Sequence, residues 1–240
     1  MKHLCIVGYA DSKDLAPYDD PEAQIFGLND LYKHIPRCNL WLQLHTPEEV
    51  DRTHKLNPET RDSWEQHKQV LREIGCPVYM REVDPDIPNS IKYPLEEICD
   101  HFGKCFQEPD HAKYFTNSVS YMLALGIYKE YEKISVYGVD MAMSEEYGHQ
   151  RPSCEFWLGM AAGRGIKIHI PNVANLLKTR YLYAYEEEKQ RAFEEKVHKT
   201  QNDLKNKREA IVSQRKQLRE QELTFAGAEQ VLKELMINYE

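Results

Sequence analysis

The stretch YFTNSVSYMLALGIYKEYEKISVYGVDMAMSEEYGHQRPSCEFWLGMAAGRGIKIHIP, residues 114–171, decides the fold class because it contains two consecutive helix-and-strand pairs. A helix is predicted to open at Thr116-Asn117-Ser118, and a buried strand over Ile134–Val139 follows it. A polar loop is then expected to hold His149 and Arg151, before a second helix and a strand over Ile166–Ile170. This order predicts parallel strands, and in open parallel sheets the loops beyond the carboxyl ends of the strands hold the ligand.

The residues before this stretch repeat the alternation of short apolar runs and helical segments. Strands are predicted over His3–Val7, Gln24–Leu28, Leu40–Leu44 and Pro77–Arg81, and helices over Thr60–Ile74 and Pro94–Phe102. Asp84–Asn89 contains two prolines and is expected to be a loop. The pattern predicts an α/β domain over residues 1–175, Rossmann-like, with a mostly parallel sheet and helices on both faces.

The composition changes from Asn175, and Asn175–Thr224 reads as one long helix because it holds no proline or glycine. Apolar residues recur every seven positions at Val197, Leu204, Ile211, Leu218 and Phe225. Such a period indicates a coiled-coil seam, although the intervening seam positions are polar. Gly227 is expected to break the helix, and Ala228–Tyr239 to form a short amphipathic one. Residues 176–240 therefore predict a helical oligomerisation tail, the alternative being a solvated helix docked on its own domain.

Composition narrows the class of protein. The net charge of −8 argues against a nucleic-acid-binding protein, although a local basic patch stays open. The six cysteines lack CxxC spacing, which favours reduced thiols over a zinc site or a disulfide framework. The first residues lack the pattern of a signal peptide, and no apolar run approaches the ~20 residues of a membrane span. We expect a soluble, cytoplasmic protein.

The first candidate ligand loop contains Gly8 and Ser12, directly after the first strand. A glycine lets the backbone approach a ligand closely, and amides at the start of the next helix can hold phosphate. The loop has neither the GxGxxG pattern nor the GK[ST] ending of a P-loop. A tight turn with a capping residue is the alternative.

Two further polar side chains, Asn29 and His45, follow the second and third strands. An asparagine there can hydrogen-bond a nucleobase or a sugar, whereas an Asx turn or a helix cap explains it equally well. Asp84 and Asp86 have the DxD spacing that holds a divalent cation in many glycosyltransferases, but in a proline-rich loop aspartates commonly form turns. We expect no metal site and no cofactor other than the ligand itself.

The helix that opens at Thr116, Asn117 and Ser118 offers hydroxyl groups and first-turn amides to an anion, a role compatible with N-capping. After the following strand, Asp140 is expected to border the pocket. His149 suits general acid–base work, and Arg151 suits phosphate. The alternative is an Asp–Arg pair that fixes the loop.

Taken together, the motifs resemble the bacterial family 42 sialyltransferases and the related Rossmann-like proteins grouped with archaeal 6-hydroxymethylpterin pyrophosphokinase. The chain also resembles, more closely, proteins of tailed phages with GVDM, EYxxQRP and a helical tail. The segments that carry the sialyltransferase resemblance are KHLCIVGYADS (2–12), GLNDLY (27–32), FTNSVSYMLALG (115–126), ISVYGVD (134–140), YGHQ (147–150) and IKIHIPNVANLL (166–177).

The sialyltransferase resemblance implies roles for individual residues. His149 would be the general base that deprotonates the acceptor hydroxyl, and Tyr147 would assist the leaving phosphate. The residues implied to contact or border the nucleotide or its sugar are Gly8, Ser12, Asn29, Thr116, Asn117, Ser118 and Asp140. The family's TSG signature is here Thr-Asn-Ser, and Arg151-Pro152 is additional.

The leading hypothesis is therefore a metal-independent, glycosyltransferase-like enzyme that binds a nucleotide or nucleotide-sugar. A second hypothesis is a phage-type binding protein without chemistry that sequesters a nucleotide signal in an anti-defence role. A third is a phage structural or assembly protein that retains a Rossmann fold. Partners are expected to be a nucleotide-type small molecule and further copies of the chain through the C-terminal helices.

Overall fold

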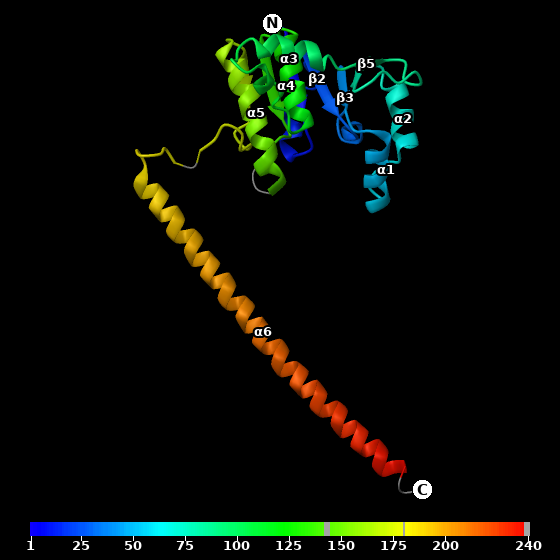
Figure 1. Ribbon diagram of the computed structural model, residues 1–240, viewed down its shortest axis with the longest axis vertical. Coiled ribbons are helices and arrows are strands. Elements are labelled where there is room, and N and C mark those ends of the chain that lie inside the picture. Colours follow the sequence, from blue (N-terminus) through cyan, green and yellow to red (C-terminus); the bar gives the residue numbers. More distant parts are fainter. Residues whose placement is uncertain (142–144, 180, 238–240) are drawn as a thin grey trace. The chain divides into compact units, whose positions relative to one another are not determined.

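The computed structural model describes residues 1–141, 145–179 and 181–237. Within these ranges, only the backbone is described for residues 145–147 and 237. The chain divides into two compact units, Met1–Lys178 and Thr179–Glu240. Figure 1 shows the strands and most helices in the first unit and a single long helix in the second.

One sheet forms the centre of the first unit. In the described part of the chain it has seven strands, in the order β5-β4-β3-β2-β1-β6-β7, and every neighbouring pair is parallel. The strands are β1 (His3–Val7), β2 (Ala23–Leu28), β3 (Leu40–Gln43), β4 (Val78–Met80), β5 (Ser90–Lys92), β6 (Lys133–Tyr137) and β7 (Lys167–His169). The predicted Rossmann-like α/β fold is confirmed.

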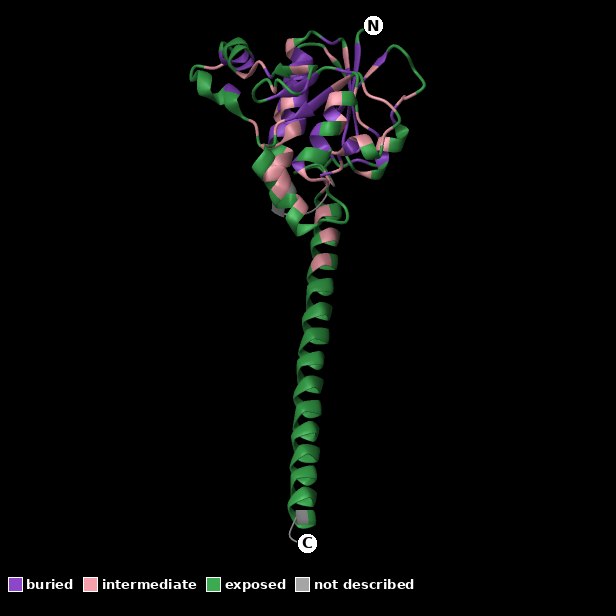
Figure 2. Cartoon of the chain, turned by 90° about the vertical axis from the view of Figure 1, so that its right-hand side faces the viewer, coloured by how far each residue is buried: buried purple, intermediate pink, exposed green. Residues whose placement is uncertain are grey.

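Three helices form a layer on one face of the sheet: α3 (Leu95–Gly103), α4 (Ser118–Tyr128) and α5 (Glu145–Gly163). The middle helix, α4, contacts the other two and lies directly against β1. A Cβ atom on Gly126 would lie 2.7 Å from Cδ2 of Leu4, so the glycine lets helix and strand approach closely. All five residues of β1 are buried, as expected for a strand covered on both faces (Figure 2).

The opposite face is covered by α2 (Trp64–Glu73) and the short 3-10 helix η2 (Leu31–Lys33). From α2, Nε2 of His67 lies 2.9 Å from Oε1 of Gln43 on β3. From η2, the ring of Tyr32 packs on Trp41 with the ring centroids 5.8 Å apart. The parallel register places Gly27 beside Trp41, whose ring fills the space that a side chain would need. Helices therefore cover both faces, as predicted.

Among the α-helices and strands, two were not predicted from the sequence, α1 (Pro47–Leu56) and the edge strand β5. Helix α1 buries none of its residues, so it lacks the apolar stripe by which helices are usually found. The sequence nevertheless contains a signal for its start, because Thr46 and Glu49 form a capping box with both hydrogen bonds present. Strand β5 is too short for an alternating pattern to stand out.

The predicted polar loop around His149 and Arg151 is wrong, because both residues belong to α5. The glycine and proline of this stretch suggested a loop. Pro152 instead lies inside the helix on its exposed side, and the helix continues through it. The helix forms because Cys154, Trp157, Leu158 and Ala161 recur at helical spacing and are all buried.

The long helix α6 also differs from expectation at both ends. It spans Glu187–Ile237, beginning twelve residues after the predicted start at Asn175 and continuing through Gly227, where a break was predicted. A helix-interior glycine costs only about 1 kcal/mol relative to alanine, which the good helix formers on both sides can absorb. Among the described residues, no helix is both long and apolar enough to cross a membrane.

Candidate functional site

Two pockets lie beyond the carboxyl ends of the strands. The first, of about 410 Å³, is lined by Tyr9, Asn29, Asp30, Gln43, His45, Glu49, Val50, Arg52, Thr53, Arg61, Asp62 and His67. The second, of about 550 Å³, is lined by Leu44, His45, Glu49, Arg81, Glu82, Lys92, Tyr93, Leu95, Glu96, Phe115, Thr116, Asn117, Ser118 and Tyr121. Because His45 and Glu49 line both, the two pockets adjoin at the end of β3, and together they are called the trough.

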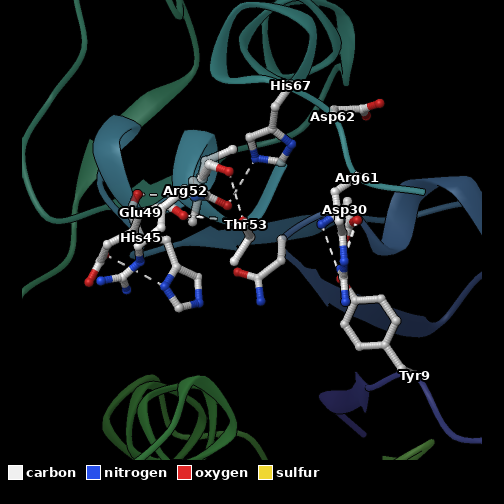
Figure 3. A pocket seen from close by; sticks show the side chains of 12 residues that line it. Tyr9, Asp30, His45, Glu49, Arg52, Thr53, Arg61, Asp62 and His67 are labelled. Atoms are coloured by element: carbon white, nitrogen blue, oxygen red, sulfur yellow. Dashed lines mark hydrogen bonds and ion pairs between the residues drawn. The ribbon is translucent and has the colours of Figure 1, made fainter. Parts of the chain in front are cut away.

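One wall of the first pocket is a cluster of Tyr9, Asp30 and Arg61, shown in Figure 3. Nη1 of Arg61 donates to both carboxylate oxygens of Asp30 at 2.9 Å. The Tyr9 hydroxyl donates to Oδ1 of Asp30 and accepts from the Asp30 amide at 3.1 Å. The cluster ties the loop after β1 and the segment before α2 to the end of β2.

The protonation states in this cluster follow from its contacts. Burial alone would raise the pKa of Asp30, but the hydrogen bond from Tyr9 and the charge of Arg61 outweigh it, so the pKa is lowered. Burial, reinforced by the neighbouring carboxylate, raises the pKa of Tyr9. At neutral pH the pocket wall therefore consists of a carboxylate held by a phenol and a guanidinium.

Asn29 supplies an unpaired acceptor in the first pocket. Its backbone is in the left-handed region at φ 51°, with its amide bonded to the Leu42 carbonyl at 3.1 Å and its carbonyl bonded to Nε1 of Trp41 at 3.1 Å. The side-chain Oδ1 is buried, yet it has no hydrogen-bond partner among the described residues. Leaving such an atom unpaired costs about 1–3 kcal/mol, which a ligand N–H or O–H would recover.

Behind this pocket, a hydrogen-bonded chain runs through His67. The Tyr32 hydroxyl lies 2.8 Å from both Nδ1 of His67 and Oδ2 of Asp62, and the other imidazole nitrogen contacts Gln43. Burial lowers the pKa of His67 to about 4. The imidazole is therefore neutral near pH 7, and Gln43, whose Nε2 donates to the His45 carbonyl at 3.1 Å, links this chain to the trough.

His45 lies at the junction of the two pockets. Its Nδ1 is 3.7 Å from Oε2 of Glu49, and its side chain is half exposed, so it is accessible from the trough. On the other side, the second pocket has an aromatic wall in which Phe115 and Tyr121 stack with their ring centroids 4.3 Å apart. Arg81 and Lys92 bring positive charge to the same pocket, and Lys92 is paired with Glu82 at 3.0 Å. Glu49 and Glu96 bring negative charge.

The triplet Thr116–Ser118 lines the second pocket at the start of α4. Oδ1 of Asn117 caps the helix by accepting from the Ser120 amide at 3.0 Å, while its Nδ2 donates to the Gln150 carbonyl at 2.9 Å. Thr116 Oγ1 lies 2.7 Å from Ser153 Oγ. The sequence therefore placed these three residues correctly at a helix N-terminus, and that end is docked on α5.

His149 and Arg151 lie on α5, and neither is among the described residues that line the two pockets. His149 is exposed and adjoins Gln150, which contacts the start of α4. Nε of Arg151 pairs with Glu155 at 2.7 Å, and its Nη2 donates to the Lys178 carbonyl at 3.1 Å. The expected alternative paired an aspartate with Arg151, whereas the structure pairs Arg151 with Glu155. The predicted role of Tyr147 falls on a side chain outside the described residues.

Gly8, Ser12 and Asp140 meet where the loops after β1 and β6 touch. The Gly8 amide donates to the Tyr137 carbonyl at 2.8 Å, and Ser12 Oγ accepts from the Gly138 amide at 2.8 Å. Ser12 also donates to Asp140 at 3.5 Å. Their proposed contact with a nucleotide stays a prediction, since these atoms are here engaged in joining two loops.

The DxD pair forms a turn bound to α2. The Asp86 amide donates to Oδ1 of Asp84 at 2.9 Å, and Nζ of Lys68 lies 3.1 Å from Asp84 and 2.7 Å from Asp86. In the part of the chain that the structure describes, no group of three or more His, Cys, Asp or Glu side chains is placed to hold a metal ion.

Several pocket residues were not singled out from the sequence, namely Tyr9, Gln43, Arg61, His67, Arg81 and Tyr121. Tyr9 follows Gly8 in a loop already under consideration, so its position was an available signal. Arg61 and His67 fall within the predicted helix Thr60–Ile74, where nothing local marks them as pocket residues.

No protein-family model matches the sequence, and no curated protein matches it. Solved structures of the sialyltransferase CstII from Campylobacter jejuni are similar in fold. The complex with cytidine-5′-monophosphate is 15% identical, with 76% of this chain and 92% of that chain covered and a TM-score of 0.43. The complex of CST-II with a trisaccharide acceptor and CMP is 15% identical, with 75% and 89% covered and a TM-score of 0.42. At this identity and TM-score, the likeness assigns no residue, ligand or activity to this chain.

Proposed function

We propose that the trough binds a nucleotide or nucleotide-sugar and that the protein is a metal-independent, glycosyltransferase-like transferase. The observation that carries this proposal is the buried, unpaired Oδ1 of Asn29, a residue that lines a pocket at the carboxyl edge of a parallel sheet. Ligands of open α/β sheets bind outside this edge, at the point where the strand order reverses, which here lies between β1 and β6. The loop after β1 reaches the first pocket through Tyr9. A nucleobase amino group or a ribose hydroxyl is a suitable donor for the orphan oxygen.

The second pocket suits the anionic part of such a ligand. The N-terminus of α4 at Thr116–Ser118 presents amides and the positive end of a helix dipole, and Arg81 adds a guanidinium. A nucleotide that spans the trough would place its phosphate here and its base or ribose beside Asn29. The sugar–phosphate bond to be broken would then lie in the second pocket, which His45 and Glu49 also line.

The proposed reaction transfers a glycosyl group to an acceptor hydroxyl. A base takes the hydroxyl proton while the acceptor oxygen bonds to the sugar carbon, and the sugar–phosphate bond breaks with its electron pair leaving on the phosphate. Amides of α4 and Arg81 stabilise that negative charge. His149 is the base that the sequence resemblance implies, and His45 is the histidine supported by the trough geometry.

Binding is tested by thermal-shift screening of nucleotides and nucleotide-sugars against wild type and Asn29→Ala, with small molecules released from the purified protein identified by mass spectrometry. A ligand of the native state raises the melting temperature by mass action. We expect the ligand to raise the melting temperature of wild type. In N29A, the ligand concentration that gives the same rise should be at least tenfold higher. Asn202→Ala, which changes an exposed residue of α6 outside both pockets, is the control. An equal ligand potency in N29A and wild type would contradict the proposed contact between Asn29 and the ligand.

Chemistry is tested by comparing turnover of the identified donor in His45→Ala and His149→Ala. Loss of ~100-fold or more in one variant identifies the base, since positioned acid–base groups contribute about 10²–10⁴-fold. Undiminished turnover in both variants would refute the proposed proton transfer.

A second candidate is a nucleotide-binding protein without chemistry. It is favoured by the pairing of Asp30 with Arg61 and Tyr9, which gives the first pocket a preformed wall. Stoichiometric retention of an unmodified nucleotide, with no product after prolonged incubation with acceptors, would establish this function in place of the transferase.

A further inference from the structure

The helix α6 carries an apolar row along its length. It contains Val197, Leu204, Ile211, Leu218, Phe225 and, seven residues further, Leu232. From Leu204 onwards these side chains are 57% to 69% exposed (Figure 2). No second helix is described in the unit that contains α6, and isolated helices owe most of their stability in proteins to packing of an apolar face.

With this row assigned to the a positions of a heptad, the d positions become mostly polar. They hold Thr200, Lys207, Gln214, Gln221, Ala228 and Leu235. In a parallel pair each d residue faces itself, so Lys207 would face the same lysine of the second copy. That arrangement opposes like charges in the middle of the seam.

The charges beside the seam favour the opposite orientation. The e positions carry Arg208 and Arg215 in one half of the helix and Glu222 and Glu229 in the other. In an antiparallel pair, e positions face e positions. Arg208 then lies opposite Glu229 and Arg215 opposite Glu222, and the two-fold axis generates each pair twice.

The same register completes the seam. Each a residue faces a d residue of the other copy, so Leu218 packs over Gln214 and Ile211 over Gln221. Lys207 is separated from its own copy and lies at Phe225, where its aliphatic stem can pack and its ammonium can reach water. The ends of the seam close with Val197 against Leu235.

We propose that two copies of this chain associate through an antiparallel coiled coil of α6, with the two-fold axis near Lys216. The overlap extends over residues 195–237, about 65 Å of helix at 1.5 Å per residue. The apolar row supplies the attraction, and the inversion of charge along the e positions selects the orientation, the role that flanking charges commonly have in coiled coils. This inference is independent of the proposed catalytic function.

Cysteine cross-linking of the full chain distinguishes the orientations. Gln217 lies at a g position beside the two-fold axis, where it meets its own copy only in the antiparallel pair. Gln221 lies at a d position and meets its own copy only in a parallel pair. The two substitutions, Q217C and Q221C, are made with Cys105→Ser, which removes an exposed native thiol.

We expect the full chain to have twice the 28.2 kDa mass of the monomer by light scattering. Under mild oxidation Q217C should form a disulfide-linked dimer, and Q221C should remain uncross-linked like the C105S parent. Cross-linking of Q221C but not Q217C would show a parallel pair and overturn the proposal. A monomeric mass without cross-linking of either variant would also overturn it.

Charge reversal provides an independent measurement. The double substitution R208E/R215E should weaken the dimer at least tenfold by sedimentation equilibrium at low salt, and adding E222R/E229R to the same chain should restore it. Circular dichroism verifies that the helix content is unchanged. Failure of the second pair to restore the dimer would contradict the proposed register.

Discussion

Gly8 and Gly138 contact each other through their backbones where the loops after β1 and β6 meet. A Cβ atom on Gly8 would lie 2.4 Å from the Gly138 carbonyl oxygen, and a Cβ on Gly138 would lie 2.3 Å from that of Gly8. Gly138 also has φ +64°, a conformation that disfavours other residues. Gly8 was considered as part of a phosphate-binding loop. The close packing of the two loops already explains why a glycine is needed at this position.

Substitution of Gly8 tests this requirement. Gly8→Ala should reduce the free energy of unfolding by about 1–3 kcal/mol, the usual range for overpacking, because backbone atoms cannot yield as a flexible side chain would. Urea denaturation followed by circular dichroism measures the change. Gly159→Ala is the matched control, since a Cβ there meets nothing within 4 Å, and it should be neutral or stabilising by up to about 1 kcal/mol. Equal stability of wild type and G8A would contradict the close contact of the two glycines.

His67 makes the stability depend on pH in a defined window. Its pKa falls from 6.5 to about 4 on folding because of burial. Below pH 6.5 the unfolded chain takes up a proton that the folded protein refuses, so stability decreases as the pH falls towards 4. The difference corresponds to about 3 kcal/mol, at about 1.4 kcal/mol per pKa unit.

The measurement is the free energy of unfolding of His67→Gln and wild type at pH 7.5, 6, 5 and 4.5. H67Q should lose less stability over this range, whatever its absolute stability. His198→Gln changes an exposed histidine on α6 and should keep the wild-type slope. A wild-type slope in H67Q would show that His67 does not cause the dependence.

Asn117 combines a helix cap with a contact to α5. Asn117→Ala should cost about 1–2 kcal/mol, because it removes the acceptor for the Ser120 amide and the donor to the Gln150 carbonyl. Asn117→Asp keeps the capping oxygen and loses only the donor, so its loss should be smaller. Thermal unfolding orders the three proteins as wild type, N117D, then N117A. Equal losses in the two variants would assign the whole effect to the contact with α5.

Glu155 fixes the segment that follows β7. Its Oε1 accepts from Nε of Arg151 and from the Leu177 amide at 2.9 Å. In Glu155→Ala the Leu177 amide should exchange with solvent at least tenfold faster in hydrogen-exchange measurements, while the β1 amides keep their protection. Unchanged exchange at Leu177 would show that another contact holds this segment.

The sheet was readable from the sequence because its strands are buried on both faces and appear as short apolar runs, as in His3–Val7. Helix α1 was not predicted because none of its residues is buried, and α5 was misjudged because Pro152 outweighed the apolar spacing that follows it. In the tail, the seven-residue period correctly indicated a long helix, whereas Gly227 was wrongly taken as the end of that helix. Local breaking signals were overestimated wherever a longer periodic pattern continued through them.

The candidate site was predictable only where a polar residue directly follows a strand or opens a helix. Asn29, His45 and the triplet Thr116–Ser118 meet that condition, and all line the trough. Arg61 reaches the trough from a segment far along the chain, so its position depends on tertiary packing that no local pattern records. His149 was expected in a loop, and the resemblance implied that it is the general base. The structure places it on α5, so its role stays a prediction.

The trough crosses the end of β3 from the side covered by α2 to the side covered by α4, with His45 and Glu49 at the crossing. The two helical layers are otherwise joined chiefly through the sheet between them. A ligand long enough to occupy both pockets would act as a mechanical tie between the layers. Its binding would make them open together, so that local fluctuations of α2 and α4, separate in the free protein, become a single cooperative event.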